Sequence, residues 1–258
     1  MGRVLIADSG PRRTTALDRK SAAAKRRFSL GVSFMLSEVS THGIASVKRA
    51  YGDWTTPNLK GWKESLHSMA IQPIQQFSYT TGKNSTDSAL IIDAMDLLHS
   101  GKVDGFCLVS SDSDFTRLAT RVRESGLLVY SFGEKKTPAA FVAACDKFIY
   151  TEILRPEVLM TGSPDLQVGS AQNAAAIALG ETQAIVRIAI EAATRDDGFA
   201  PLGHVGNLIL KNSPAFDPRN YGCVKLGELM RRLPFVEVKE VHKDGSPVIH
   251  PYVRLKST

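Results

Sequence analysis

The fold is decided by the stretch Phe106-Cys107-Leu108-Val109-Ser110-Ser111-Asp112-Ser113-Asp114-Phe115. Its first half is an uninterrupted apolar run, as in strands that are buried on both faces of a parallel sheet. The run ends directly in two aspartates, and a helical pattern follows. In open α/β sheets the reactive groups lie beyond the carboxyl ends of the strands. We therefore expect Asp112 and Asp114 to belong to a functional site.

Strands and helices alternate around this stretch. Further β-rich runs cover residues 45–50, 72–79, 127–132 and 148–150, and helical patterns cover 58–68, 86–99, 115–125 and 138–144. The candidate for a first strand is the run at 4–6. Such alternation is typical of βαβ units. The sequence therefore predicts an α/β fold in which a mostly parallel sheet has helices on both faces.

Length and composition limit the class of protein. The chain has 258 residues, of which 43% are hydrophobic and 22% charged, enough for one large or two modest globular domains. No uncharged apolar run approaches the about 18 residues that a membrane helix needs. The three cysteines are far apart and show no CxxC spacing, which argues against a disulfide framework or a zinc site. We expect a soluble, cytoplasmic protein that does not contact a membrane.

Positive charge is concentrated at the N-terminus. The net charge is +6, and the first 50 residues hold 10 basic and 3 acidic residues. A basic stretch can follow a phosphate backbone, although such runs are more often solvated segments. The basic residues 12–27 followed by the apolar residues 28–36 also resemble a targeting leader, but its removal would remove the candidate first strand. We expect residues 1–40 to be an atypical part of the first domain.

A composition change separates two domains. Residues 153–180 contain Pro156, Gly162 and Pro164 and then become rich in Ala, Asn and Gln, which is typical of a linker. Helical patterns follow at 182–193, 202–211 and 225–233, and β-rich runs at 235–241 and 248–255 flank a turn. We predict a first domain over residues 1–152 and a small winged-helix domain over residues 181–258.

A second group of acids lies in the helical pattern at 86–99. Asp87 stands at its start and Asp93 lies six residues later, in a helix with apolar residues on all sides that we expect to be deeply buried. Carboxylates buried close together either raise their pKa values or hold a cation, and oxygen ligands favour Mg²⁺ or Mn²⁺. Alternatively, Asp87 and Asp112 each cap a helix N-terminus, but capping does not account for Asp93.

Three sequence blocks in this order resemble the NYN domain, LabA-like branch, a PIN-like ribonuclease fold. They are Tyr51-Gly52-Asp53-Trp54, then Gly82-Lys83-Asn84-Ser85-Thr86-Asp87 with Asp93-Ala94, and then Ser110-Ser111-Asp112-Ser113-Asp114-Phe115. The resemblance covers residues 45–152 and implies an RNA nuclease that depends on Mg²⁺ or Mn²⁺. It implies catalytic roles for Asp87, Asp93, Asp112 and Asp114, and a role for Ser111 in positioning water or phosphate.

The first strand departs from the family pattern. The family usually opens with an apolar strand that ends in Asp-x-Asp-Asn, whereas this chain reads Val4-Leu5-Ile6-Ala7-Asp8-Ser9-Gly10. Only Asp8 can substitute there, so the expected metal ligands are Asp8, Asp87, Asp112 and Asp114. Because a site of this kind loses a central ligand with its first-strand carboxylate, a non-catalytic RNA-binding regulator stays open as an alternative.

Residues 186–255 are similar to the LOTUS (OST-HTH) winged-helix module. The similarity lies in Gly203-His204-Val205-Gly206, in Phe216-Asp217-Pro218-Arg219-Asn220-Tyr221-Gly222 and in Lys225-Leu226. It implies binding of RNA or docking of a protein partner, and because PIN-like sites are often shared by dimers we also expect a homodimer. The candidate RNA-binding residues are Lys83, Trp54, Arg219, Tyr221 and Lys225. For Trp54 and Tyr221, packing into a core is the alternative.

A different enzyme class also fits part of the pattern. Asp112-Ser113-Asp114-Phe115-Thr116 after an apolar strand satisfies the Asp-x-Asp-x-Thr pattern of haloacid-dehalogenase-like phosphatases, in which the first Asp is the nucleophile. That alternative does not use Asp87 or Asp93, and it has only Asp146, Lys135 and Lys136 for the groups it needs downstream. We therefore predict hydrolysis of RNA phosphodiester bonds at a carboxylate-bound metal ion.

Overall fold

The computed structural model describes residues 2–8, 22–55, 66–77, 85–154, 182–195, 198–242 and 249–256. The chain divides into two units, Met1–Pro156 and Glu157–Thr258. Each unit is described by itself below. Within the described residues, no helix is both long and apolar enough to cross a membrane.

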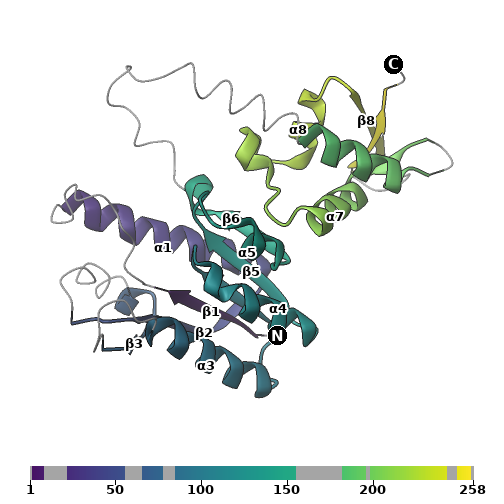
Figure 1. Ribbon diagram of the computed structural model, residues 1–258. Helices are drawn as coiled ribbons and strands as arrows, with labels where there is room; N and C mark the ends of the chain where they lie inside the picture. Colours follow the sequence, from purple (N-terminus) through teal and green to yellow (C-terminus); the bar gives the residue numbers. More distant parts are fainter. Residues whose placement is uncertain are drawn as a thin grey trace. The chain divides into compact units, whose positions relative to one another are not determined.

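The first unit is built on a six-stranded parallel sheet (Figure 1). Its strands are β1 (Gly2–Asp8), β2 (Ile44–Gly52), β3 (Gln72–Gln75), β4 (Gly105–Val109), β5 (Leu128–Gly133) and β6 (Lys147–Tyr150). They lie in the order β3-β2-β1-β4-β5-β6, and all neighbours are parallel. The chain proceeds from β1 to one side and later to the other, so the switch point lies between the carboxyl ends of β1 and β4.

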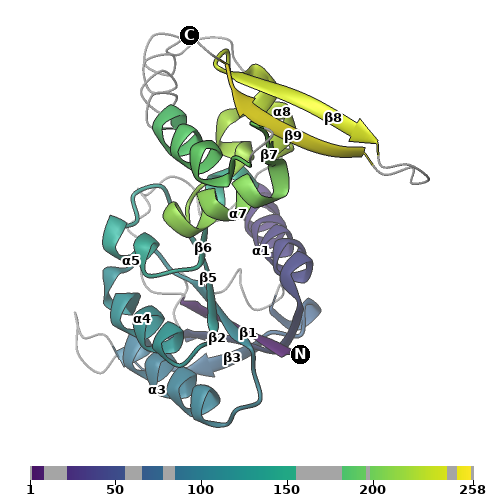
Figure 2. The same cartoon turned by 90° about the vertical axis from the view of Figure 1, so that its right-hand side faces the viewer.

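Helices cover both faces of this sheet (Figures 1 and 2). Helix α1 (Ala22–His42) lies on one face, and α3 (Ser85–His99), α4 (Thr116–Glu124) and α5 (Ala139–Ala143) lie on the other. The alternation of side chains along each strand explains this division. On β6, Ile149 packs in the cluster that contains Val39 of α1, whereas the adjacent Phe148 contacts Phe141 of α5 with ring centroids 6.0 Å apart. The α/β fold predicted from the sequence is confirmed.

Helix α1 was not predicted. Residues 28–36, read above as the apolar part of a leader-like segment, belong to this helix, whose Val32 and Val39 are buried under the sheet. The segment is therefore an integral layer of the first unit, beside a central strand β1 that starts at Gly2. The predicted strand at 4–6 lies within β1.

The expectation that the helix at 86–99 is deeply buried on all sides is wrong. Leu90, Ala94 and Leu98, four residues apart, are buried, but Ile92 is 61% exposed. Helix α3 therefore lies on the surface of the sheet with one apolar stripe inward. The predicted helix at 58–68 falls mostly outside the described residues, which show a helical turn at 66–68.

The second unit is a small winged-helix domain, as predicted. A helix over residues 182–193, α7 (Leu202–Asn212) and α8 (Leu226–Arg232) pack on a three-stranded sheet of order β7-β9-β8. Its strands are β7 (Ala200–Pro201), β8 (Val236–His242) and β9 (Ile249–Leu255), and β8 and β9 form an antiparallel pair. Val186, Val205, Leu229 and Val253 belong to one core of this unit.

Candidate metal centre

Three carboxylates converge at the carboxyl edge of the parallel sheet. Asp112 and Asp114 follow the end of β4, and Asp87 lies in the first turn of α3. One ligand oxygen from each lies within 4.8 Å of those from the other two. Asp87 is half-buried, whereas Asp112 and Asp114 are exposed. Two distant blocks of sequence thus contribute to one negatively charged cluster near the switch point.

The segment after β4 is held by its own hydrogen bonds. The Asp112 backbone N–H donates to Ser110 Oγ (3.1 Å), and Asp112 Oδ1 accepts from the Asp114 backbone N–H (3.0 Å). Asp112 therefore caps the short 3₁₀ helix η2 (Ser113–Phe115), as the capping alternative proposed. A carboxylate has two oxygens and several lone pairs, so capping is compatible with membership in the cluster.

The loop after β5 packs directly against this segment. Ser111 Oγ accepts from the Glu134 backbone N–H (2.8 Å), and the Ser110 backbone N–H donates to Phe132 O (2.9 Å). Gly133 lies so close that a Cβ there would be 2.6 Å from Ser110 O. These contacts with the end of β5 thus fix the position of Ser111 and of the aspartates that follow β4.

Asp93 is not one of the three clustered carboxylates and has two hydrogen-bond donors of its own. Arg49 Nη1 and Tyr51 Oη donate to Asp93 Oδ2 at 2.9 and 2.6 Å. Burial of the phenol and its hydrogen bond to Asp93 raise the pKa of Tyr51 far above its ordinary range. The mid-helix acid that suggested catalysis has a structural partner in Arg49, a residue that sequence reasoning missed because it lies 44 positions away.

Trp54 and Tyr51 pack inside the first unit. The Trp54 side chain is buried with Val32 and Ile71, and its Nε1 donates to Ile74 O (2.9 Å). The core alternative therefore accounts for Trp54, and its ring is not exposed to a nucleobase. Asp8 is the last residue of β1, in register with Tyr51, and its side chain lies outside what the structure describes, as does the whole of Lys83.

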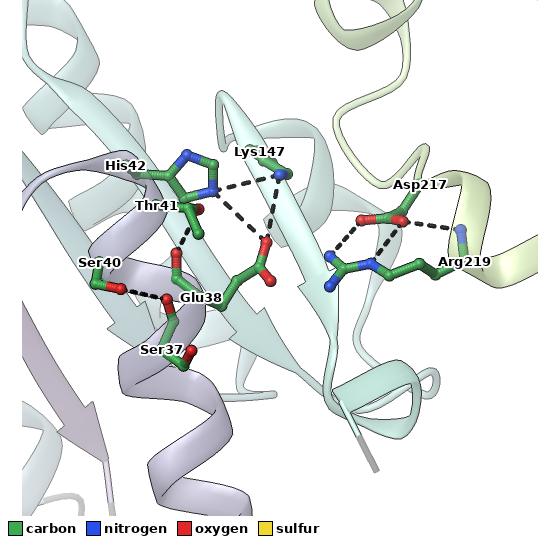
Figure 3. A network of polar contacts seen from close by, with 8 residues as sticks. All are labelled: Ser37, Glu38, Ser40, Thr41, His42, Lys147, Asp217 and Arg219. Carbon is green, nitrogen blue, oxygen red and sulfur yellow. Dashed lines mark hydrogen bonds and ion pairs between the residues drawn. The ribbon is translucent and has the colours of Figure 1, made fainter. Parts of the chain in front are cut away.

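Two of the three candidates in the second unit are engaged internally. Arg219 donates from Nε to Asp217 Oδ1 (2.9 Å) and from Nη2 to Oδ2 (2.6 Å), as Figure 3 shows. The Tyr221 ring packs against Phe216 with centroids 5.7 Å apart. Lys225, directly before α8, is exposed. Of these three candidates, Lys225 alone has an exposed side chain.

A second polar network in Figure 3 ties α1 to β6. Glu38 Oε1 lies 3.7 Å from Lys147 Nζ and 3.7 Å from His42 Nε2. Lys147 opens β6 and His42 ends α1, so the network lies at the amino edge of the sheet. It joins two layers of the fold at the edge opposite the aspartates.

Asp146 also lies at the amino edge. It precedes β6, and its Oδ2 accepts from the backbone N–H of Val129, near the start of β5 (2.8 Å). The downstream carboxylate that the phosphatase alternative needs is therefore at the edge opposite Asp112. This placement disfavours that alternative.

Several solved structures are similar to parts of this chain. A protein from Vibrio parahaemolyticus is 15% identical, covers 58% of this chain and 92% of its own, and has a TM-score of 0.42. One from Nitrosomonas europaea is 27% identical over 40% of this chain and 90% of its own, with a TM-score of 0.27. One from Chromobacterium violaceum is 39% identical over 29% of this chain and 78% of its own, with a TM-score of 0.24. No curated protein matches the chain.

The family comparison is specific for both units. The OST-HTH/LOTUS domain matches residues 180–248, and the NYN domain matches residues 17–154, more than half of the chain. The resemblances to an NYN domain and to an OST-HTH/LOTUS domain are thereby confirmed. With its parallel sheet, its three aspartates at the carboxyl edge and this match, the chain belongs to the NYN domain family and carries an OST-HTH/LOTUS domain after it.

Proposed function

We propose that the protein is a ribonuclease in which Asp87, Asp112 and Asp114 hold Mg²⁺ or Mn²⁺. The observation that carries the proposal is the approach of three carboxylate oxygens to within 4.8 Å of one another in an NYN domain. Two oxygens bound to one Mg²⁺ stand at most about 4.2 Å apart, twice the metal–oxygen distance. A small closing movement would therefore let the three aspartates share an ion.

Asp8 is the fourth ligand in this proposal. Strand β1 lies between β2 and β4, so its last residue reaches the same edge of the sheet as Asp112. A carboxylate there would complete an all-oxygen set, which suits the hard cations Mg²⁺ and Mn²⁺. It would take the place of the aspartates that end the first strand in other members of the family.

The residues around the cluster suit phosphodiester hydrolysis. A divalent ion, when bound, polarises the phosphate, orients water and offsets the developing negative charge. In this proposal the aspartates bind the ion, and the Ser111 hydroxyl, held by the Glu134 N–H, donates a hydrogen bond to the phosphate. Lys83 and the exposed Lys225 bind the RNA backbone outside the reacting group.

Cleavage of single-stranded RNA with Mn²⁺, in the presence and absence of a chelator, tests the proposal. The wild-type protein should cleave, chelator should abolish cleavage, and Asp112→Asn should lose cleavage while it keeps RNA binding. Asp96→Asn is the matched control, because Asp96 is an exposed acid on the same helix as Asp87 and lies outside the cluster. It should cleave like the wild type.

A non-catalytic RNA-binding regulator is the second candidate. The observation that favours it is the first strand, which offers one aspartate where the family has two and an asparagine. In the same assay, wild-type protein that binds RNA but does not cleave it with Mn²⁺ would support this candidate and contradict the nuclease.

A further inference from the structure

Helix α3 carries two aspartates with different surroundings. Asp87 belongs to the three-carboxylate cluster, whereas Asp93 accepts from Arg49 and Tyr51 of β2. Six residues on an α-helix correspond to about 9 Å along the axis and about 120° around it. The two carboxylates therefore point in different directions. Both could bind the same ion only if α3 moved relative to the sheet.

The donors of Asp93 belong to a fixed part of the molecule. Arg49 and Tyr51 are two residues apart on β2, so they share one face of the strand. The Tyr51 ring is fully buried, and β2 is hydrogen-bonded on both sides, to β1 and to β3. Asp93 thus attaches α3 to an interior strand of the sheet.

The apolar contacts of α3 are less directional. Its buried stripe consists of Leu90, Ala94 and Leu98, and apolar packing of this kind is non-directional. Hydrogen bonds and ion pairs depend on angle and distance. The bonds of Asp93 to Arg49 and Tyr51 are therefore well suited to fix the rotation of α3 about its axis and its position along the sheet.

We propose that Asp93 is a positioning residue that, through Arg49 and Tyr51, fixes α3 so that Asp87 reaches Asp112 and Asp114. The proposal rests on the proposed function, since it assumes a divalent ion at those three aspartates. It assigns a common purpose to two of the sequence blocks, because Tyr51 of the first block holds Asp93 of the second.

The direction in which one substitution changes the affinity for Mn²⁺ distinguishes a positioning role of Asp93 from metal ligation. If Asp93 positions α3, Arg49→Gln removes an anchor and Mn²⁺ binding weakens. If Asp93 were a metal ligand, the same substitution would remove a competing cation from its carboxylate, and Mn²⁺ binding would strengthen. Loss of an outer-shell partner typically costs about 10-fold to 100-fold in metal affinity.

The experiment is calorimetric titration of the 258-residue chain with Mn²⁺. We expect Arg49→Gln and Asp93→Asn each to weaken binding about 10-fold, the double variant to be no weaker than the worse single variant, and Tyr51→Phe to weaken it less. Arg123→Gln is the matched control, because Arg123 pairs with Asp146 at 3.2 Å, at the opposite edge of the sheet. It should bind Mn²⁺ like the wild type.

Several results would overturn the proposal. Unchanged or tighter binding by Arg49→Gln contradicts it, and so do losses that multiply in the double variant. If Arg49→Gln does not fold, as judged by circular dichroism, Tyr51→Phe decides: it keeps the buried ring, and unchanged Mn²⁺ affinity there overturns the proposal. A wild-type protein that binds no Mn²⁺ would instead contradict the proposed function.

Discussion

At the scale of single residues, the three clustered carboxylates repel one another when no cation is bound. Ligand oxygens of Asp87, Asp112 and Asp114 lie within 4.8 Å of one another, and like charges at such distances repel. Functional sites commonly reduce stability in this way. The repulsion should therefore be measurable as a destabilisation of the metal-free protein.

Asp114→Asn should raise the melting temperature of the metal-free first unit by about 1–2 °C, because it removes one of three clustered charges. Addition of Mn²⁺ should raise the melting temperature of the wild type, since a ligand that binds only the folded state stabilises it. Mn²⁺ should raise the melting temperature of Asp114→Asn much less. Differential scanning fluorimetry with chelator and then with Mn²⁺ measures both shifts, and a lower melting temperature for Asp114→Asn in chelator would contradict the clustering of charge.

The buried phenol of Tyr51 gives a prediction about pH. Burial and the bond to Asp93 raise its pKa in the folded protein, so this contribution to stability is complete below the ordinary pKa of about 10 and declines as pH rises above it. Tyr51→Phe should cost about 1 kcal/mol at pH 7 through the lost hydrogen bond. The difference from the wild type should shrink above pH 10 in urea denaturation, and a difference that grows there would contradict the assignment.

At the scale of secondary-structure elements, the end of β5 positions the segment after β4 that carries Asp112 and Asp114. A Cβ at Gly133 would lie 2.6 Å from Ser110 O, 2.6 Å from a ring carbon of Phe148 and 2.7 Å from Thr137 Oγ1. The Ser110 oxygen belongs to the backbone that leads into Ser111 and Asp112. The absence of a side chain at Gly133 is therefore required for β4 and β5 to end side by side.

Gly133→Ala should destabilise the first unit by about 1–3 kcal/mol, the usual cost of overpacking, and weaken Mn²⁺ binding. Gly203→Ala is the control: it lies in α7 and has nothing within 4 Å of the added Cβ. Because Ala favours helix over Gly by up to about 1 kcal/mol, this control should be neutral or stabilising. Urea denaturation compares the two, and equal effects would show that the close approach at Gly133 is unimportant.

The sequence predicted those elements whose residues carry a local pattern. The apolar run ending at Val109 identified β4, and the aspartates after it identified the edge of the site. Helix α1 was not predicted because its inward-facing residues, Val32, Met35, Leu36 and Val39, recur at helical spacing only in its second half. The basic residues before them made the segment resemble a leader. The Arg49–Asp93 pair could not be predicted, because contacts between residues 44 positions apart depend on the strand order, which no local pattern specifies.

At the scale of the whole molecule, each unit has its own core. The second unit packs Val186, Val205, Leu229 and Val253 together, and the OST-HTH/LOTUS domain matches residues 180–248 within it. It should therefore fold when produced alone as residues 180–258.

Analytical ultracentrifugation of the 258-residue chain would test the homodimer expected from the resemblance to the family.

The isolated second unit should bind single-stranded RNA without cleaving it. Lys225→Glu should weaken binding and reduce its dependence on salt, because each lost phosphate contact lowers the salt slope by about 0.7 for single strands. Lys211→Glu, an equal charge change in the last turn of α7, should have a smaller effect. Fluorescence anisotropy at several salt concentrations measures this, and equal losses in the two variants would contradict a specific role for Lys225.

The most direct test of the metal centre is titration of the 258-residue chain with Mn²⁺, followed by electron paramagnetic resonance. We predict that the wild type and the control Asp96→Asn bind Mn²⁺ with the same affinity, and that Asp87→Asn, Asp112→Asn and Asp114→Asn each lose that binding. Wild-type protein without Mn²⁺ affinity, or aspartate variants that bind as tightly as the wild type, would contradict the account.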